Sequence, residues 1–300
     1  MEVQQTIALK LVRLIPLRLR KLLTCTLAGA FYHLSLKHRL IAIHNLMRAF
    51  PEKSLREITQ IAKRSYLSFA IVAAEFIEIP YINKDNLHKW ITIEGLENYT
   101  AACSAGKGVL LFGGHFGNWE IGNAALAIAT QPFVFLYRIL DSSFLENNIT
   151  RVRASYGNVS LSKENAMRPV IRLLKKSATI NMLIDQNVAW YDGAFVNFFG
   201  RRACTTSGLA LLALHTTAPV LPAFTRRLPD GKYIVEIGPR VEIVRTGDRS
   251  NDVLINTQNF TKIIEEEIRK SPEQWFWVHQ RWKTKPCQAK HRGNLSETEN

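Results

Sequence analysis

Apolar and polar residues alternate along the middle of the chain in the pattern of a sheet covered by helices. Short apolar runs, typical of buried strands, are separated by longer segments that each have one apolar face, typical of helices. The pattern predicts strands at 90–96, 108–112, 132–137, 159–162, 179–184, 220–226 and 233–237, and helices at 97–105, 144–156, 168–177 and 207–216, with another starting after Asn118. This alternation predicts an α/β fold with a mostly parallel central sheet flanked by helices.

The segments on either side of this region have helical patterns. Helices are predicted over 37–50, before Pro51, and over 54–79, before Pro80, because proline cannot continue a helix. Glu75 and Glu78 lie on the second of these and are interpreted as helix-surface or packing partners. A last amphipathic helix runs from Asp252 to Ser271. We therefore predict N-terminal membrane-associated helices in residues 1–50, an α/β domain in 51–287 and a polar disordered tail in 288–300.

The first of these segments has the composition of a membrane-associated helix. Residues 7–36 are largely apolar, carry several lysines and arginines and contain no acid. Their uncharged part, residues 22–36, is shorter than the roughly 20 residues needed to span a bilayer. An uncleaved helix that lies on or dips into the membrane is favoured, with a signal peptide or an ordinary docking helix as alternatives. The basic flank favours the cytoplasmic leaflet.

The charge of the whole chain restricts its partners. With 39 Lys and Arg against 25 Asp and Glu, the net charge is +14, which favours an anionic lipid, an anionic bilayer, an acidic carrier protein or nucleic acid. Nucleic acid is disfavoured, because the sequence has no zinc-finger spacing, RNP-type strand or base-reading helix. The four cysteines are scattered, which favours a reducing compartment, and no histidine has ligand-like spacing. We therefore predict neither a metal nor a cofactor.

The stretch from Gly108 to Glu120, GVLLFGGHFGNWE, combines a strand, a glycine turn and the start of a helix. His115 lies at the exit of the strand, Gly117 lies in the turn, and Asn118 is suited to cap the helix. A carboxylate bonded to one ring nitrogen of a histidine fixes its tautomer and leaves the other nitrogen as a base. We therefore predict His115 as a general base oriented by Glu120. No activated Ser or Cys lies nearby, so the base is expected to act on a hydroxyl of the substrate.

Other candidate residues follow neighbouring strands. In parallel sheets ligands bind at the carboxyl ends of the strands, which places His115, Arg138 and Asp185 at one edge. Arg138 and Arg151 are candidates for binding phosphate or orienting the acceptor, and the alternative is that they are ordinary surface charges. Near the C-terminus, the tryptophans at 275, 277 and 282 are interpreted as core residues, whereas Arg281 and Lys283 are candidates for phosphate contact.

The His115-Phe-Gly-Asn-Trp-Glu120 stretch resembles the H-x4-D/E signature of the glycerolipid and lysophospholipid acyltransferase superfamily. Within it, the chain is most similar to the bacterial lipid A late acyltransferases, the lauroyl and myristoyl transferases. Further blocks of that branch follow in order over roughly residues 40 to 285: Tyr137-Arg138, Asp185-Gln186, Val196 to Gly200, Thr205 to Gly208, Ala218 to Pro222 and Pro272 to Lys283.

The resemblance implies an enzyme that moves a fatty acyl chain from acyl-carrier protein to a hydroxyl of a lipid A precursor or related glycolipid. It implies as partners the carrier protein, an anionic phosphorylated lipid and the membrane surface at the cytoplasmic face of the bacterial inner membrane, and no nucleic acid. It also implies substrate-binding roles for Gly117, Asn118, Arg138, Arg151 and Asp185. Three alternatives stay open: transfer from acyl-CoA to another lipid, hydrolysis of acyl esters or thioesters on the same fold, and lipid or nucleic-acid binding without catalysis.

Overall fold

A central sheet organises the molecule, for which a computed structural model describes residues 7–286. The tail predicted for residues 288–300 lies outside the described residues. The strands lie in the order β1-β9-β8-β2-β5-β3-β4, and all neighbours are parallel except β8 and β9. Their bounds are β1 Ile91–Glu94, β2 Val109–Gly113, β3 Val134–Tyr137, β4 Val159–Ser162, β5 Thr179–Leu183, β8 Val220–Arg227 and β9 Tyr233–Ile237. The prediction of a mostly parallel α/β sheet is confirmed.

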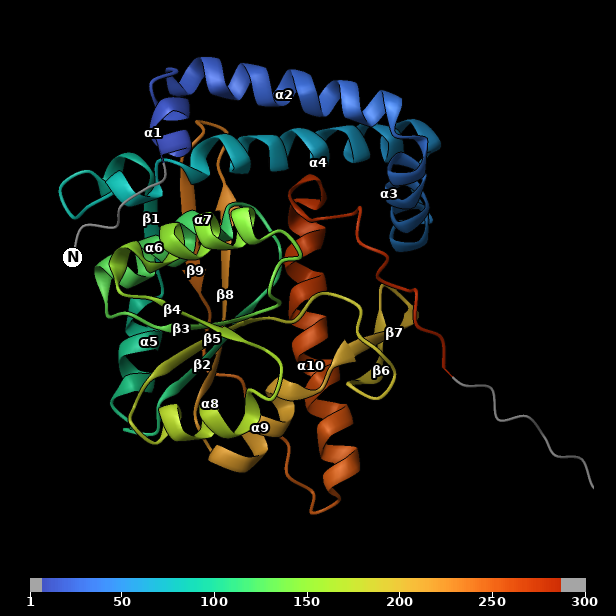
Figure 1. The fold of residues 1–300 in the computed structure, drawn as a ribbon. Helices are drawn as coiled ribbons and strands as arrows, with labels where there is room; N and C mark the ends of the chain where they lie inside the picture. The colour runs from blue at the N-terminus through green and yellow to red at the C-terminus, as the bar shows by residue number, and fades with distance from the viewer. Residues whose placement is uncertain (1–6, 287–300) are drawn as a thin grey trace, which may run out of the picture.

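Helices cover both faces of this sheet (Figure 1). Side chains alternate between the faces of a strand, so Leu110 and Phe112 of β2 enter one core while Val109 and Leu111 enter the other. The first core is covered by α8 (Met167–Leu174), α9 (Gly208–Thr216) and α10 (Arg249–Lys270), and the second by α5 (Leu96–Cys103) and α6 (Trp119–Ala129). Helix α7 (Ser143–Arg153) connects β3 to β4, and short 3-10 turns occupy Ile79–Tyr81, Leu87–Lys89, Ala154–Tyr156 and Pro272–Gln274.

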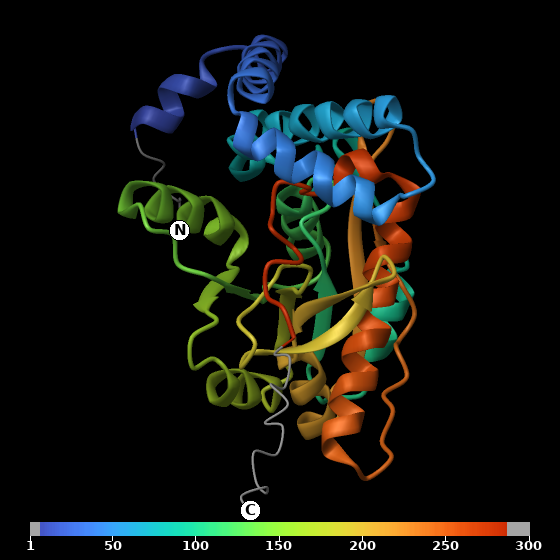
Figure 2. The same ribbon diagram turned by 90° about the vertical axis from the view of Figure 1, so that its right-hand side faces the viewer.

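The N-terminal helices form a layer across one end of the sheet domain (Figure 2). They are α1 (Ile7–Arg13), α2 (Leu17–Leu34), α3 (Leu36–Ala49) and α4 (Leu55–Phe76). Helix α4 starts with a capping box, in which Ser54 and Glu57 satisfy each other's backbone N–H groups. Tyr32, Leu46 and Ile58 from these helices are buried in the same core as α10. Within the described residues, no helix combines the length and the apolar character that crossing a bilayer requires.

Besides small shifts at the ends of elements, one hairpin and the start of the last helix differ from the prediction for physical reasons. The segment between the strand predicted at 179–184 and the helix predicted at 207–216, for which the sequence predicted no element, contains an antiparallel hairpin of β6 (Gly193–Phe198) and β7 (Arg201–Thr206). The backbone of Asn197 in this hairpin exchanges hydrogen bonds with the side chain of Gln258 on α10. Helix α10 starts before Asp252, because the Asp248 carboxylate caps it by accepting the backbone N–H groups of Ser250 and Asn251.

Candidate active site

The ring of His115 is held by a carboxylate from the neighbouring strand. His115 follows β2 and Asp185 follows β5, and these two strands are parallel neighbours. The His115 Nδ1 atom lies 2.8 Å from Asp185 Oδ1, and the His115 backbone N–H donates to Oδ2 at 2.9 Å. The indole N–H of Trp275 also donates to Oδ2, at 2.8 Å. Three donors therefore converge on one carboxylate and fix it against the histidine.

The surroundings of Asp185 keep it ionised. Its side chain is 1% exposed, and this burial alone would raise its pKa, but the His115 ring, the His115 backbone N–H and the Trp275 indole together lower the pKa to about 2. An ionised carboxylate only accepts hydrogen bonds, so the proton of the His115 ring lies on Nδ1. This tautomer leaves Nε2 as the basic nitrogen, on a ring that lines a cavity of about 780 Å³.

Glu120, which the sequence predicted as the orienting acid, has different partners. Its carboxylate accepts hydrogen bonds from two of the three guanidinium nitrogens of Arg153, Nε at 3.0 Å and Nη2. It also accepts the indole N–H of Trp119 at 3.0 Å. The acid that contacts the imidazole is therefore Asp185, which takes the place predicted for Glu120. Burial by itself would lower the pKa of Arg153, but the Glu120 carboxylate raises it. Glu120 thus holds a charged guanidinium in the cavity wall.

Gly117 gives the turn after His115 its shape. Its φ angle is +56°, and a Cβ atom built on it would lie 1.7 Å from the carbonyl oxygen of Thr225 on β8. Its N–H donates to the carbonyl oxygen of Gln274 at 2.9 Å. Only glycine fits this position, because any side chain would collide with the backbone of the neighbouring strand. The contacts of Gly117 are thus with other parts of the protein backbone.

Asn118 is fully buried behind the turn. Its side-chain oxygen accepts the backbone N–H of Ile121 at 3.1 Å and so caps α6, as the sequence predicted. Its amide group donates to Glu75 on α4 at 2.9 Å. Both ends of the amide are therefore used inside the protein, in positioning the turn.

The two predicted phosphate-binding arginines differ in their relation to the cavity. Arg138 lines it, with a side chain that is 70% exposed and pairs with Asp141 at 3.1 Å. Arg151 lies exposed on α7, and the arginine of that helix that lines the cavity is Arg153, two residues further on. The sequence analysis missed Arg153, because the pattern of α7 did not establish which of its faces is turned inward.

The cavity beside His115 has a volume of about 780 Å³ and two kinds of wall. One wall is polar and includes Glu120, Asn123, Tyr137 and Arg153. The other is apolar, with side chains from β5, α8 and α9: Met167, Val170, Met182, Leu211 and Leu212. A cavity of this size and character suits a molecule with a polar head and a long hydrocarbon chain.

The C-terminal aromatic segment is structural. All three predicted core tryptophans, Trp275, Trp277 and Trp282, are buried. The prediction that Arg281 contacts phosphate is wrong, since this side chain is fully buried and donates to the carbonyl oxygen of Cys204 at 2.8 Å and to the Thr205 hydroxyl. Burial lowers the pKa of Arg281 to about 10. Lys283 lies at the surface.

The fold and the site define a class of α/β proteins in which a histidine held by a carboxylate lies at the carboxyl edge of the sheet and lines a cavity with polar and apolar walls. The chain belongs to the family of bacterial lipid A biosynthesis acyltransferases, because the model of that family matches residues 4–284.

Individual relatives that align with most of this chain are named as lipid acyltransferases. The chain is 29% identical to the lipid A biosynthesis palmitoleoyltransferase of Escherichia coli K12 over 264 residues, which covers 87% of this chain and 84% of that protein. It is 26% identical to the lauroyltransferase of the same organism, over 84% of this chain and 81% of that one. It is 24% identical to the phosphatidylinositol mannoside acyltransferase of Mycolicibacterium smegmatis, over 79% and 77%. A solved 1-acyl-sn-glycerophosphate acyltransferase from Thermotoga maritima aligns with a TM-score of 0.39 at 14% identity, over 87% of this chain and 99% of that one, which is too distant to bear on function.

Proposed function

We propose that this protein transfers a fatty acyl chain from the thioester of acyl-carrier protein to a hydroxyl of a lipid A precursor or a related glycolipid. The observation that carries the proposal is the His115–Asp185 pair, whose ring lines a cavity with one polar and one apolar wall. The relatives that act on lipid A and on a phosphatidylinositol mannoside support a glycolipid acceptor.

In the proposed reaction, His115 takes the proton of the acceptor hydroxyl on Nε2 while the hydroxyl oxygen attacks the thioester carbonyl. The tetrahedral intermediate collapses with cleavage of the carbon–sulfur bond, and the leaving thiolate takes the proton back from the imidazolium. The ionised Asp185 carboxylate stabilises the imidazolium between these steps. A general base of this kind accelerates a reaction by about 10²–10⁴-fold.

The polar wall is proposed to bind the charged parts of the substrates. Glu120 fixes the Arg153 guanidinium in one orientation, with two of its nitrogens engaged. Because the guanidinium group of Arg153 is planar and held in place, its remaining N–H groups point in fixed directions. They suit a phosphate or the carbonyl oxygen that becomes negative during attack. Arg138, at the exposed side of the same cavity, supplies a second cation for the acceptor. The apolar wall formed by β5, α8 and α9 receives the acyl chain.

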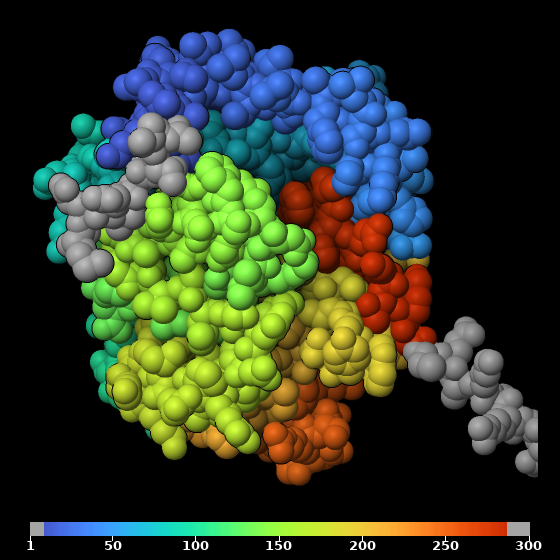
Figure 3. Space-filling view, in the orientation of Figure 1, coloured from blue at the N-terminus to red at the C-terminus, as the bar shows by residue number. Residues whose placement is uncertain are grey.

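The N-terminal helices are proposed to hold the enzyme on the cytoplasmic face of the inner membrane. Residues 7–49 contain lysines and arginines but no Asp or Glu. Helix α2 exposes a row of large apolar side chains: Leu19, Leu22, Leu23, Leu27, Phe31 and Leu34. In the space-filling view, these helices form an outer layer at one end of the molecule (Figure 3). Apolar and basic residues together suit an anionic bilayer surface, and the net charge of +14 also suits an acidic carrier protein.

The test has a cellular and a purified arm. Mass spectrometry of lipids from cells with and without the protein should show one additional acyl chain on a lipid A precursor. With purified enzyme, acyl-carrier protein thioester and the precursor, His115→Ala should abolish transfer while the thermal melting temperature stays within a few degrees. An unchanged lipid A with another lipid altered would contradict the acceptor. Release of free fatty acid at the same rate without any acceptor would identify a hydrolase.

A further inference from the structure

A buried carboxylate behind the catalytic turn connects three separate elements. Glu75 lies in the last turn of α4, and its side chain is 1% exposed. Its Oε2 atom accepts the amide N–H of Asn118 at 2.9 Å and the hydroxyl of Tyr233, at the start of β9, at 2.6 Å. Its Oε1 atom lies 2.6 Å from the ammonium group of Lys21 on α2. One side chain thus joins the turn, the sheet and the N-terminal layer.

The contact with Asn118 bears directly on the position of His115. Asn118 follows His115 by three residues and caps α6 through its side-chain oxygen. The amide can donate to Glu75 and accept from Ile121 in only one orientation, so Glu75 selects the orientation that caps the helix. The turn between His115 and this cap contains Gly117, which already packs against β8 without spare space. A shift of Asn118 therefore moves the backbone on which His115 lies.

The charge of Glu75 is balanced from the N-terminal layer. A buried carboxylate requires a positive partner or several hydrogen bonds, and Lys21 is the cation within ion-pair distance among the described residues. The hydroxyl of Tyr233 cannot replace this charge, because burial, together with the nearby Glu75, raises its pKa and keeps it neutral. The stability of the turn thus depends on α2 being in place.

We propose that Glu75 is a positioning residue for acyl transfer, which holds the turn that carries His115 and connects it through Lys21 to the helix with the exposed apolar row. The inference rests on the proposed function, in which His115 is the base. Glu75 itself touches no substrate, since it does not line the cavity.

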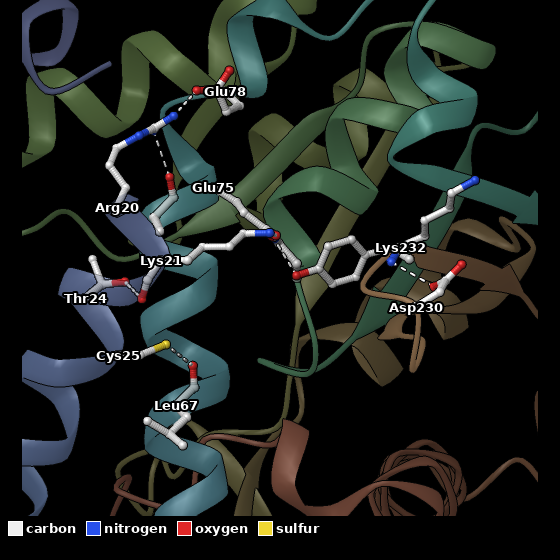
Figure 4. A network of polar contacts seen from close by, with 12 residues as sticks. Arg20, Lys21, Thr24, Cys25, Leu67, Glu75, Glu78, Asp230 and Lys232 are labelled. Atoms are coloured by element: carbon white, nitrogen blue, oxygen red, sulfur yellow. Dashed lines mark hydrogen bonds and ion pairs between the residues drawn. The ribbon is translucent and has the colours of Figure 1, made fainter. Parts of the chain in front are cut away.

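A second ion pair, between α2 and the residues that follow α4, provides a control. Arg20, next to Lys21, pairs with Glu78 (Figure 4). It also donates to the carbonyl oxygens of Ile15 and Ala74, each at 3.0 Å. This pair joins α2 to the segment just after α4, where Glu78 also lies 3.5 Å from Arg13 of α1. The Arg20–Glu78 pair makes no contact with the turn, so its loss weakens the attachment of the N-terminal helices without releasing Asn118.

The experiment compares kcat and KM of purified full-length variants with acyl-carrier protein thioester and the lipid precursor. Glu75→Ala should lower kcat by about 10–100-fold with KM for the donor changed by less than about threefold, the range expected when a supporting residue is removed. Glu75→Gln keeps an oxygen for Asn118 and Tyr233 and should recover most of kcat. Lys21→Met should lower kcat several-fold, and Glu78→Gln should leave kcat within about twofold of the wild type. This difference is expected because Lys21 pairs with Glu75, which contacts the turn through Asn118, whereas Glu78 makes no such contact.

Asn118→Ser tests the same link from the other side, and it remains informative if Glu75→Ala does not fold. Serine still caps α6 but lacks the amide donor to Glu75, so kcat should fall as in Glu75→Ala. If the folded Glu75 and Asn118 variants retain the kcat of the wild type, the positioning role is refuted. If Lys21→Met matches Glu78→Gln, the connection to α2 is refuted. His115→Ala is the reference: activity remaining in that variant would refute the proposed function instead.

Discussion

Replacing Asp185 by Asn should invert the tautomer of His115 while leaving the protein folded. Three N–H donors face the two carboxylate oxygens, with the His115 backbone and Trp275 on Oδ2 and the imidazole on Oδ1. An asparagine keeps the two bonds at Oδ2 only if its oxygen takes that place. Its NH₂ group then faces the ring, so Nδ1 must accept and the proton moves to Nε2. The nitrogen that should act as the base is thereby blocked.

The size of the effect follows from this geometry. The variant keeps two hydrogen bonds in their original direction and reverses the third. It loses the strength that a charged acceptor gives, typically about 1.5–3 kcal/mol for such a bond, but it no longer buries a charge, so a stable fold is expected. A wrong tautomer at an orienting carboxylate costs about 10⁴-fold in kcat. Initial rates of acyl transfer, followed by mass spectrometry of the lipid product, measure the loss. Nitrogen chemical shifts of ¹⁵N-labelled histidine report the tautomer.

Glu120→Gln is the control that separates the two acids. Its amide still accepts one hydrogen bond from Arg153 but loses the charge, so acceptor binding should weaken roughly tenfold, about 1.4 kcal/mol, with the His115 tautomer unchanged. The reasoning is refuted if Glu120→Gln loses 10³-fold or more in kcat while Asp185→Asn behaves like the wild type. That outcome would mean that the carboxylate of Glu120, five residues after His115, acts on the ring during catalysis.

Three further outcomes are expected. Burial lowers the pKa of His279 from 6.5 to about 4, and its Nε2 atom accepts the backbone N–H of Asn187 at 2.8 Å. As the pH falls, the unfolded chain therefore binds a proton on His279 before the folded protein does, and the free energy of unfolding should fall by at most about 3 kcal/mol between pH 6.5 and pH 4. The melting temperatures at pH 7 and pH 5 should differ less in His279→Gln than in the wild type, and an equal difference would contradict the assignment. In Gly208→Leu, the new Cβ would lie 3.7 Å from the Met182 methyl group in the apolar wall, so the variant should prefer donors with shorter acyl chains. The ratio of kcat/KM between short and long donors should rise roughly tenfold per lost methylene pair, measured with carrier thioesters of graded length. An unchanged preference would mean that the acyl chain binds elsewhere. Replacing the exposed Leu22 and Leu27 by Ser should weaken binding to anionic vesicles roughly tenfold or more with an unchanged melting temperature, because each substitution removes a leucine side chain that would be buried in the lipid. Unchanged binding would show that another surface of the protein contacts the membrane.

The sequence was most informative where burial leaves few alternatives. A short apolar run such as 109–112, followed by glycines, is typical of a strand covered on both faces, so the centre of the sheet followed from the pattern. The rule that ligands bind at the carboxyl edge then placed His115, Arg138 and Asp185 together, as the adjacent strands β2, β5 and β3 do in the structure. Spacing along one segment could not choose between two acids, since the contact of His115 with Asp185 joins residues 70 positions apart.

Other residues escaped prediction because their partners come from distant segments. The β6–β7 hairpin has two adjacent arginines and a glycine where an apolar alternation would be expected, and its order comes from packing on α10. Arg281 has the charge of a surface residue, yet the fold supplies a carbonyl oxygen and a hydroxyl that satisfy it in the interior. Tertiary hydrogen bonds determine the conformation of the hairpin and the burial of Arg281, and the pattern of a single sequence does not show which distant residues form them.

The three acids around the turn have separate tasks because each is already occupied. Asp185 holds the ring, Glu75 holds the helix cap behind it, and Glu120 holds Arg153 in the wall of the cavity. The charge of Arg153 is therefore largely balanced before any substrate arrives, and a phosphate or carbonyl oxygen gains mainly from its fixed geometry. Arg138 is paired only at the surface, where water and salt screen it. In the proposed reaction, the exposed arginine would therefore contribute to attraction of an anionic lipid over distance, whereas Arg153 would orient the bound head group relative to His115.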